Sequence, residues 1–285
     1  MQFIIILLCA LLSCTKVTTQ GYVAKGNVRS TADSVLANCM VFGLVSLIFS
    51  VSVRNGINTE IFLYAILFGV FSSLFQVFYA LALESGPFSA TCMLINLSMV
   101  VNVGFSLIYY GEKITVIKVI GVILCFLALF LNTRSDGRKI NVKWIIYVVL
   151  AFVSTGGLGI VQKIFAKSKL ASGVEQLVFL GYLVAFAVTL AVVLLQTAAK
   201  QERNFKMNRK NISLLAIVAL TLGLYQNLNT YANSFIDAIV LNPSISGLAT
   251  TFQMISGRII FKERFSRKQI CAIFIGILAI LLISM

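Results

Sequence analysis

The chain has 285 residues, of which 59% are hydrophobic and 11% are charged, and its mean hydropathy is +0.98. Soluble domains contain roughly 45 to 50% apolar residues, so this composition excludes a soluble globular protein. Lysine and arginine outnumber aspartate and glutamate by 23 to 9, which gives a net charge of +14. Histidine is absent, and with it the commonest general base and metal ligand. We therefore expect a membrane protein that is not an enzyme, with no metal site and no cofactor.

Ten apolar runs of membrane-spanning length follow one another along the chain. The helices expected from them cover residues 2–22, 31–53, 60–83, 88–110, 114–132, 144–165, 174–196, 212–234, 239–261 and 267–284. The first run contains Leu11-Leu12-Ser13-Cys14, which is similar to a lipoprotein processing site, but the basic segment that precedes such a site is missing. We expect this run to remain as a helix. The predicted fold is all-α, with ten transmembrane helices.

The sequence contains a weak internal repeat whose matches fall on polar residues, which are rare in apolar runs. Equivalent pairs, at offsets of 142 to 151 residues, are Gln20 and Gln162, Lys25 and Lys167, Gln76 and Gln226, and Glu112 and Glu263. We predict a first five-helix repeat over 1–133, a second over 144–285, and a basic connecting loop over 134–143. Because five is odd, the second copy enters the membrane in the opposite orientation. Inverted repeats of this kind are typical of transporters.

Basic residues gather on one side of the predicted bundle. The loops after the first, fifth, seventh and ninth spans hold fifteen lysines and arginines, against six in the opposite loops and adjoining helix ends. Excess positive charge marks the cytoplasmic side, so this count places both termini outside.

Residues 79–132 read YALALESGPFSATCMLINLSMVVNVGFSLIYYGEKITVIKVIGVILCFLALFLN, and residues 261–284 repeat their ending as FKERFSRKQICAIFIGILAILLIS. These segments resemble EamA-type modules, so the whole chain is similar to ten-helix permeases of the drug/metabolite transporter superfamily. The resemblance implies transport, and a cavity among the first, third, fourth, sixth, eighth and ninth helices. It also implies cytoplasmic termini, contrary to the charge count, so the orientation stays open. Lys262 departs from the pattern, because the first copy has Gly111 there.

Polar residues inside spans are costly and are therefore candidates for a substrate site. Those that share helix faces at spacings of three or four are Gln76, Tyr79, Asn102, Gln226, Asn229, Asn233 and Gln253. Since Gln76 and Gln226 are equivalent in the repeat, we expect their amide faces to meet across the pseudo-twofold axis. Hydrogen bonds that only hold the bundle together would produce the same stripes.

Lys16 lies within about 6 Å of the middle of the first span, one turn before Gln20. No aspartate or glutamate occurs near the centre of any span, so carbonyls, amides, water or an anionic substrate must act as partner. We predict that both residues belong to the substrate site, with Lys16 also a candidate for proton coupling. Lys163 lies near a helix end, where its ammonium is expected to reach the interface.

Glu112 and Glu263 precede Thr115 and Ser266, the expected N-cap residues of the fifth and tenth helices. A carboxylate at a helix start is stabilised by the backbone N–H groups and the helix dipole. We therefore assign both glutamates a structural role.

The predicted function is a multi-pass permease of a bacterial plasma membrane. It would export a small polar metabolite, such as an amino acid, nucleobase or nucleoside-like compound, by alternating access around a central site. The alternatives are a multidrug exporter of lipophilic cations and a non-transporting membrane scaffold or sensor. The expected partners are the small-molecule substrate and the lipid bilayer, without nucleic acid. Ion coupling and the choice between monomer and homodimer stay open.

Overall fold

The computed structural model describes residues 2–53, 58–111, 115–132, 142–203, 205 and 207–263, and residues 271, 274–275, 278–279 and 282 of the C-terminal segment. All regular structure in these residues is helical. Eight helical segments among them are long and apolar enough to cross a membrane, namely Gln2–Asn27, Thr31–Phe49, Thr59–Ser85, Phe88–Tyr110, Val142–Ala166, Ala171–Ala198, Arg209–Phe235 and Ala238–Ile259. The described part of the chain is therefore that of a multi-pass membrane protein.

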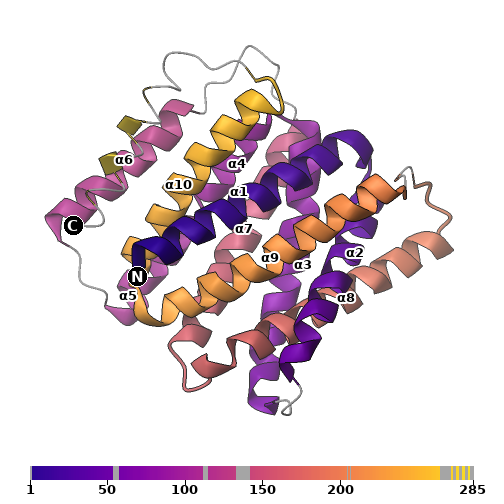
Figure 1. Ribbon diagram of the computed structural model, residues 1–285, viewed down its shortest axis with the longest axis horizontal. Coiled ribbons are helices and arrows are strands. Elements are labelled where there is room, and N and C mark those ends of the chain that lie inside the picture. Colours follow the sequence, from indigo (N-terminus) through magenta and orange to yellow (C-terminus); the bar gives the residue numbers. More distant parts are fainter. Residues whose placement is uncertain are drawn as a thin grey trace.

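The α-helices follow the order of the apolar runs (Figure 1). They are α1 (Gln2–Asn27), α2 (Thr31–Phe49), α3 (Phe62–Ser85), α4 (Phe88–Asn96), α5 (Met99–Tyr110), α6 (Val116–Asn132), α7 (Val142–Ala166), α8 (Val174–Ala198), α9 (Arg209–Phe235) and α10 (Ala238–Ile259). Short 3₁₀ turns lie at Ser50–Val53, Thr59–Ile61 and Ala171–Gly173. The expected fourth span is thus two helices, and the expected tenth, 267–284, lies largely outside the described residues.

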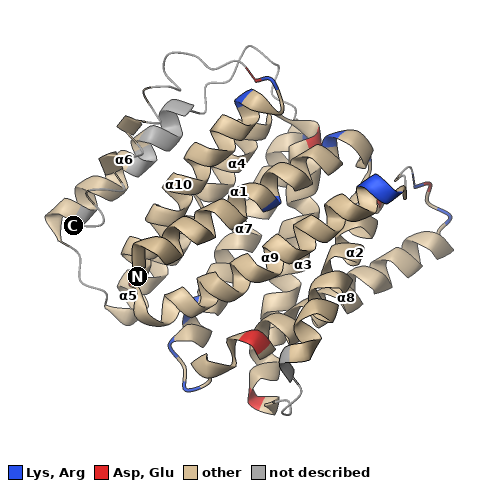
Figure 2. Ribbon diagram, in the orientation of Figure 1, with Lys and Arg blue, Asp and Glu red and all other residues tan. Residues whose placement is uncertain are grey.

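Apolar side chains cover the outside of the bundle, and polar side chains are buried inside it. Ile108 is 91% exposed and Val116 76%, whereas Gln76 is 1% exposed and Gln226 3%. Figure 2 shows that most charged residues lie at helix ends and in loops. In water this surface would be unfavourable, because each exposed aliphatic side chain forgoes the free energy of burial. The distribution suits a lipid environment, where no water satisfies an outward polar group.

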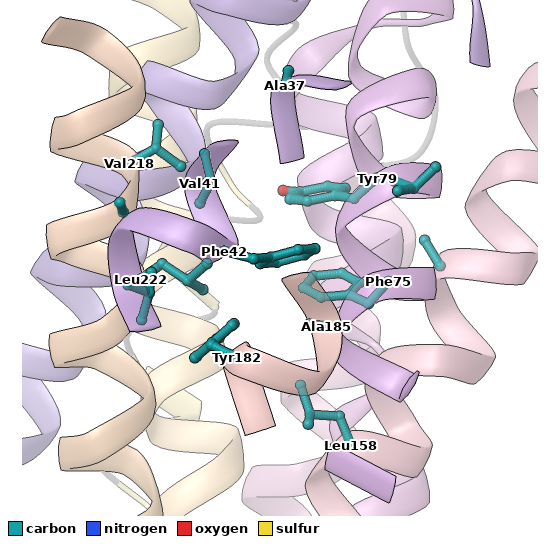
Figure 3. Packing of buried hydrophobic residues seen from close by; sticks show 14 of the residues in the cluster. Ala37, Val41, Phe42, Phe75, Tyr79, Leu158, Tyr182, Ala185, Val218 and Leu222 are labelled. Atoms are coloured by element: carbon teal, nitrogen blue, oxygen red, sulfur yellow. The ribbon is translucent and has the colours of Figure 1, made fainter. Parts of the chain in front are cut away.

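The helices pack in pairs that join the early part of the chain to the late part. α1 lies against α9 and α10, and α3 lies against α7 and α8, while α2 packs on α8. Figure 1 shows α1 and α9 side by side through the middle of the molecule. Aromatic rings fill the interface between α2, α3 and α8 (Figure 3). There the Tyr182 ring stacks on Phe42 at 5.6 Å between centroids and meets Phe68 edge to face at 5.4 Å.

The contact between α3 and α8 depends on small residues. A Cβ atom added to Gly69 would lie 2.5 Å from the carbonyl oxygen of Gly181 and 2.8 Å from Val184. Small residues at such crossings let two backbones approach closely, which is a principal source of helix association in membranes.

We expect Gly69→Ala to destabilise the protein by roughly 1–3 kcal/mol, since the added methyl group forces two packed backbones apart. Gly104 is the matched control, because a Cβ atom there meets nothing within 4 Å. Gly104→Ala should be neutral, or stabilising by up to about 1 kcal/mol through helix propensity. Thermal unfolding in detergent measures both variants, and equal melting temperatures would contradict the assignment.

Candidate functional site

A cavity lies at the centre of the bundle, between α1, α3, α4, α5, α7, α9 and α10. The cavity volume, counted as the space that the centre of a water molecule can occupy, is about 90 Å³. This is enough for several waters or a small ligand. Its polar lining residues are Ser13, Lys16, Tyr79, Asn96, Ser98, Asn102, Thr155, Gln162, Tyr225, Gln226, Asn229, Asn242 and Ser246. They come from the first, third, fourth, sixth, eighth and ninth spans, the six that the family resemblance places around a cavity.

Lys16 reaches the cavity from the middle of α1 and is only 4% exposed. Its Nζ atom lies over the rings of Phe75, at 5.2 Å from the centroid, and Tyr79, at 5.6 Å. The Tyr79 hydroxyl donates to Cys92 Sγ at 3.4 Å, which turns the ring face toward the ammonium. Both rings lie within the distance at which an aromatic face attracts a cation.

The break between α4 and α5 brings amide and hydroxyl groups to the cavity. At Leu97 and Ser98 the backbone turns through bonds of the i→i+3 kind, such as Ser98 N–H to Ile95 at 3.0 Å. Such turns inside a helix often mark functional positions, and broken helices line the sites of many transporters. Asn96 Nδ2 donates across to α10, to Thr250 Oγ1 at 2.7 Å and Gln253 Oε1 at 3.0 Å.

The opposite wall of the cavity is a hydrogen-bonded amide network between α7 and α9. Gln162 Nε2 donates to Gln226 Oε1 and to Thr230 Oγ1, both at 2.8 Å, and Gln162 Oε1 accepts from Asn229 Nδ2 at 3.4 Å. Gln162, Gln226 and Asn229 all line the cavity. Because the network fixes three amide orientations, it presents a defined set of donors and acceptors to a ligand.

The expected meeting of Gln76 with Gln226 is not found, because Gln226 pairs with Gln162 instead. Gln76 does not line the cavity, and among the described residues neither atom of its side-chain amide has a hydrogen-bond partner. Its backbone carbonyl accepts from Gln20 Nε2 at 3.5 Å and Asn38 Nδ2 at 3.3 Å. Gln20 borders a separate cavity of about 20 Å³. The sequence predicted which face of its helix Gln226 occupies, but not that Gln162 of α7 would be its partner on that face.

Five of the nine candidate residues line the cavity, namely Lys16, Tyr79, Asn102, Gln226 and Asn229. Asn233 and Gln253 do not: Asn233 Nδ2 donates to the Asn229 carbonyl at 2.9 Å, and Gln253 holds Asn96. Asn96 and Gln162 also line the cavity, although they are not among the site residues predicted from the sequence. The repeat signal could have found Gln162, since it is the equivalent of Gln20.

Aromatic rings close the bundle on the side where α1 ends. Phe88, at the start of α4, stacks on Phe261 at 4.3 Å between centroids, and Lys25 Nζ lies 4.7 Å from the Phe261 centroid. A Cβ atom on Gly21 would meet the Phe88 ring at 2.8 Å, so the stack rests directly on α1. Gly21 lies about 7.5 Å along α1 from Lys16. The stack therefore lies against α1 about one and a half turns beyond Lys16.

Glu263 stabilises the start of α4, and the helix start at 266–267 for which it was predicted lies outside the described residues. Its carboxylate accepts from the backbone N–H groups of Phe88, at 2.8 Å, and Ser89, at 3.2 Å, and from the Ser89 hydroxyl. The cap therefore serves α4, 174 residues earlier in the chain, where Pro87 supplies no side-chain cap of its own. The equivalent residue, Glu112, lies outside the described residues.

Lys163 corrects a second expectation. It is 2% exposed, and its Nζ atom donates to the carbonyl of Ile236 at 3.4 Å, just beyond the end of α9. The carbonyl groups at a helix end attract a cation through the helix dipole. The ammonium is therefore held inside the bundle and does not reach the interface.

Together, the apolar exterior and buried polar cavity define a multi-pass membrane protein of transporter type. The model of the EamA-like transporter family matches residues 4–134 and again residues 142–285, so the chain belongs to this family, within the drug/metabolite transporter superfamily. A solved crystal structure, described only as that of a protein, shares 16% identity and a TM-score of 0.67, over 97% of this chain and 98% of its own. At that identity the likeness shows the fold alone. No curated protein matches the chain.

The two glutamines equivalent in the repeat provide a matched test of the amide network. Gln162→Leu should lower the unfolding free energy by roughly 1–2 kcal/mol, because Gln226, Asn229 and Thr230 lose bonds in a buried site. Gln20→Leu should cost less, since Gln20 makes one bond of 3.5 Å and its Oε1 is already unpartnered. Thermal unfolding compares them, and a larger loss for Gln20→Leu would contradict this description.

Proposed function

We propose that the protein is a permease that moves a small polar metabolite across a plasma membrane by alternating access around the central cavity. The cavity itself carries this proposal, because a polar chamber of about 90 Å³ inside an apolar bundle has no structural purpose that apolar packing would not serve better. The amide and hydroxyl lining suits an amino acid, a nucleobase or a nucleoside-like compound, since amides both donate and accept hydrogen bonds. Export is the proposed direction.

Alternating access further requires two halves that move against each other, and we propose two inverted five-helix repeats over 1–133 and 144–285, ten spans in all, joined by 134–143. The packing pairs support this: α1 lies on α9 as α7 lies on α3, and α1 lies on α10 as α7 lies on α4 and α5. Each pair becomes the other when every helix is replaced by its equivalent in the other half, α1 by α7, α9 by α3, and α10 by α4 and α5. The two family matches support the duplication itself.

The lining also bears on the alternatives. Lipophilic cations are captured by carboxylates or aromatic cages, and no aspartate or glutamate is among the described residues that line the cavity. Lys16 would repel such cations from the same space. A scaffold or sensor needs no central chamber, so the cavity favours a permease over both alternatives.

Filling the cavity should abolish transport without unfolding the protein. Ser246 lines it from α10, whereas Thr251, on the same helix, does not. We expect Ser246→Leu to reduce saturable exchange by about tenfold or more, because the added side chain occupies the substrate position. Thr251→Leu should retain the exchange.

The assay uses proteoliposomes loaded with amino acids, nucleobases, nucleosides, sugar phosphates or lipophilic cations, and measures counterflow. Equal melting temperatures would show that both variants fold. Saturable exchange of no compound in the panel would contradict the proposed function, and exchange of lipophilic cations alone would favour the multidrug exporter.

The Phe88–Phe261 stack is proposed as the closed end of the cavity. Phe261→Ala should speed the labelling of Ser98→Cys, a cavity position, by a membrane-impermeant maleimide, because it removes half of the stack. Phe62→Ala is the control, since Phe62 is 53% exposed on the outside of α3. Peptide mass spectrometry reads the labelling at position 98. An unchanged rate in Phe261→Ala would place the closure elsewhere.

A further inference from the structure

Lys16 is a cation whose counter-charge the described residues do not supply. The residue is only 4% exposed, and among the described residues its ammonium has two aromatic faces but neither a hydrogen bond nor an ion pair. Attraction to ring faces is weaker than the hydration that a buried ammonium gives up. The side chain is therefore poised for an anionic partner.

The position of Lys16 shows where that partner would lie. Lys16 borders the central cavity, and the described residues around it carry no carboxylate, so the cavity has an unbalanced positive charge. At low dielectric this charge acts strongly on any anion that enters, because screening by water is weak. Lys210, on α9, differs: its ammonium also lies over a ring, Tyr22, but it is exposed and lies outside the cavity.

Asn102 places a second requirement on the ligand: Lys16 requires an anionic group, whereas Asn102 requires a hydrogen-bond donor. Its Oδ1 atom is buried and has no hydrogen-bond partner among the described residues, and the residue lines the same cavity. A carbonyl oxygen accepts hydrogen bonds and repels an anion, so a ligand that satisfies it must bring an N–H or O–H group. The cavity therefore combines one cation and one unpaired acceptor.

We propose that Lys16 binds the anionic group of the substrate, a carboxylate or a phosphate, while an N–H or O–H donor elsewhere on the same small molecule pairs with Asn102. This inference rests on the proposed function and narrows it, because it disfavours neutral nucleobases and nucleosides within the proposed range. Substrate recognition then consists of a charge-assisted bond that neutralises Lys16 and neutral bonds that select the body of the molecule.

The experiment compares compounds that differ only in the charged group. L-Lactate and L-lactamide are a carboxylate and its neutral amide. Glycerol 3-phosphate and glycerol are a phosphate ester and its neutral parent alcohol. L-Serine, uracil and uridine are tested beside these two pairs. Binding is measured by thermal stabilisation of the purified protein, and transport by counterflow in proteoliposomes. Each is repeated on Lys16→Met, which keeps the length of the side chain, on Lys16→Arg, and on the control Lys210→Met.

We expect carboxylates or phosphates to bind and exchange in preference to their neutral counterparts, and the two pairs distinguish the two anion types. Lys16→Met should weaken the binding of the anionic compounds by about tenfold or more, because it removes a charged donor. The binding of the neutral compounds should not change. Lys16→Arg should restore part of the binding, and Lys210→Met should behave as the unsubstituted protein.

Two results would overturn the inference and leave the permease intact. One is saturable exchange of uracil or uridine with no preference for anions. The other is a Lys16→Met variant that loses anionic and neutral compounds equally, which would assign the ammonium to packing or proton coupling. Exchange of no compound at all would instead contradict the proposed function, and the inference with it. Asn102→Leu separates the second contact: it should weaken L-serine more than acetate, which has no N–H or O–H donor.

Discussion

The ammonium of Lys16 is the group around which the interior of this protein is organised. A charge in the middle of a membrane-spanning bundle is tolerated only where polar groups or water surround it, so the helices around α1 present amides and hydroxyls at this depth. Two rings, Phe75 and Tyr79, cover one side of the cation, and the cavity borders the other. A purely apolar core would not accommodate Lys16, whereas the polar cavity lies directly beside it.

The two halves of the chain use equivalent residues differently. In the second half Gln162 and Gln226 bond to each other and form a rigid cavity wall. In the first half Gln20 donates one long hydrogen bond to the backbone of Gln76, and three side-chain amide atoms of this pair have no hydrogen-bond partner among the described residues. Buried unpaired amides are unfavourable, so the first arrangement is the less stable of the two.

The end of the bundle near Gly21 joins distant segments through a few contacts. Glu263 caps α4, Phe261 stacks on Phe88, and Phe88 rests on Gly21. These contacts link the start of α4 and the end of α1 to the segment after α10. Phe88 and Ser89 are buried, so the carboxylate of Glu263 satisfies backbone N–H groups that water does not reach freely.

The sequence by itself determined the membrane environment, the order of nine helical segments and the burial of Lys16, because apolar run length and the depth of a charge depend on local composition. It also indicated the duplication, through polar residues at matching positions. Lateral packing alone decided that Gln226 meets Gln162, that Gln253 holds Asn96, and that Glu263 caps a helix 174 residues away. Helical periodicity assigns a residue to a face, but the helix opposite that face is fixed by long-range contacts such as the close approach of Gly69 and Gly181. For this reason five candidate residues reach the cavity, and four equally polar ones, including Gln20 and Gln76, do not line it.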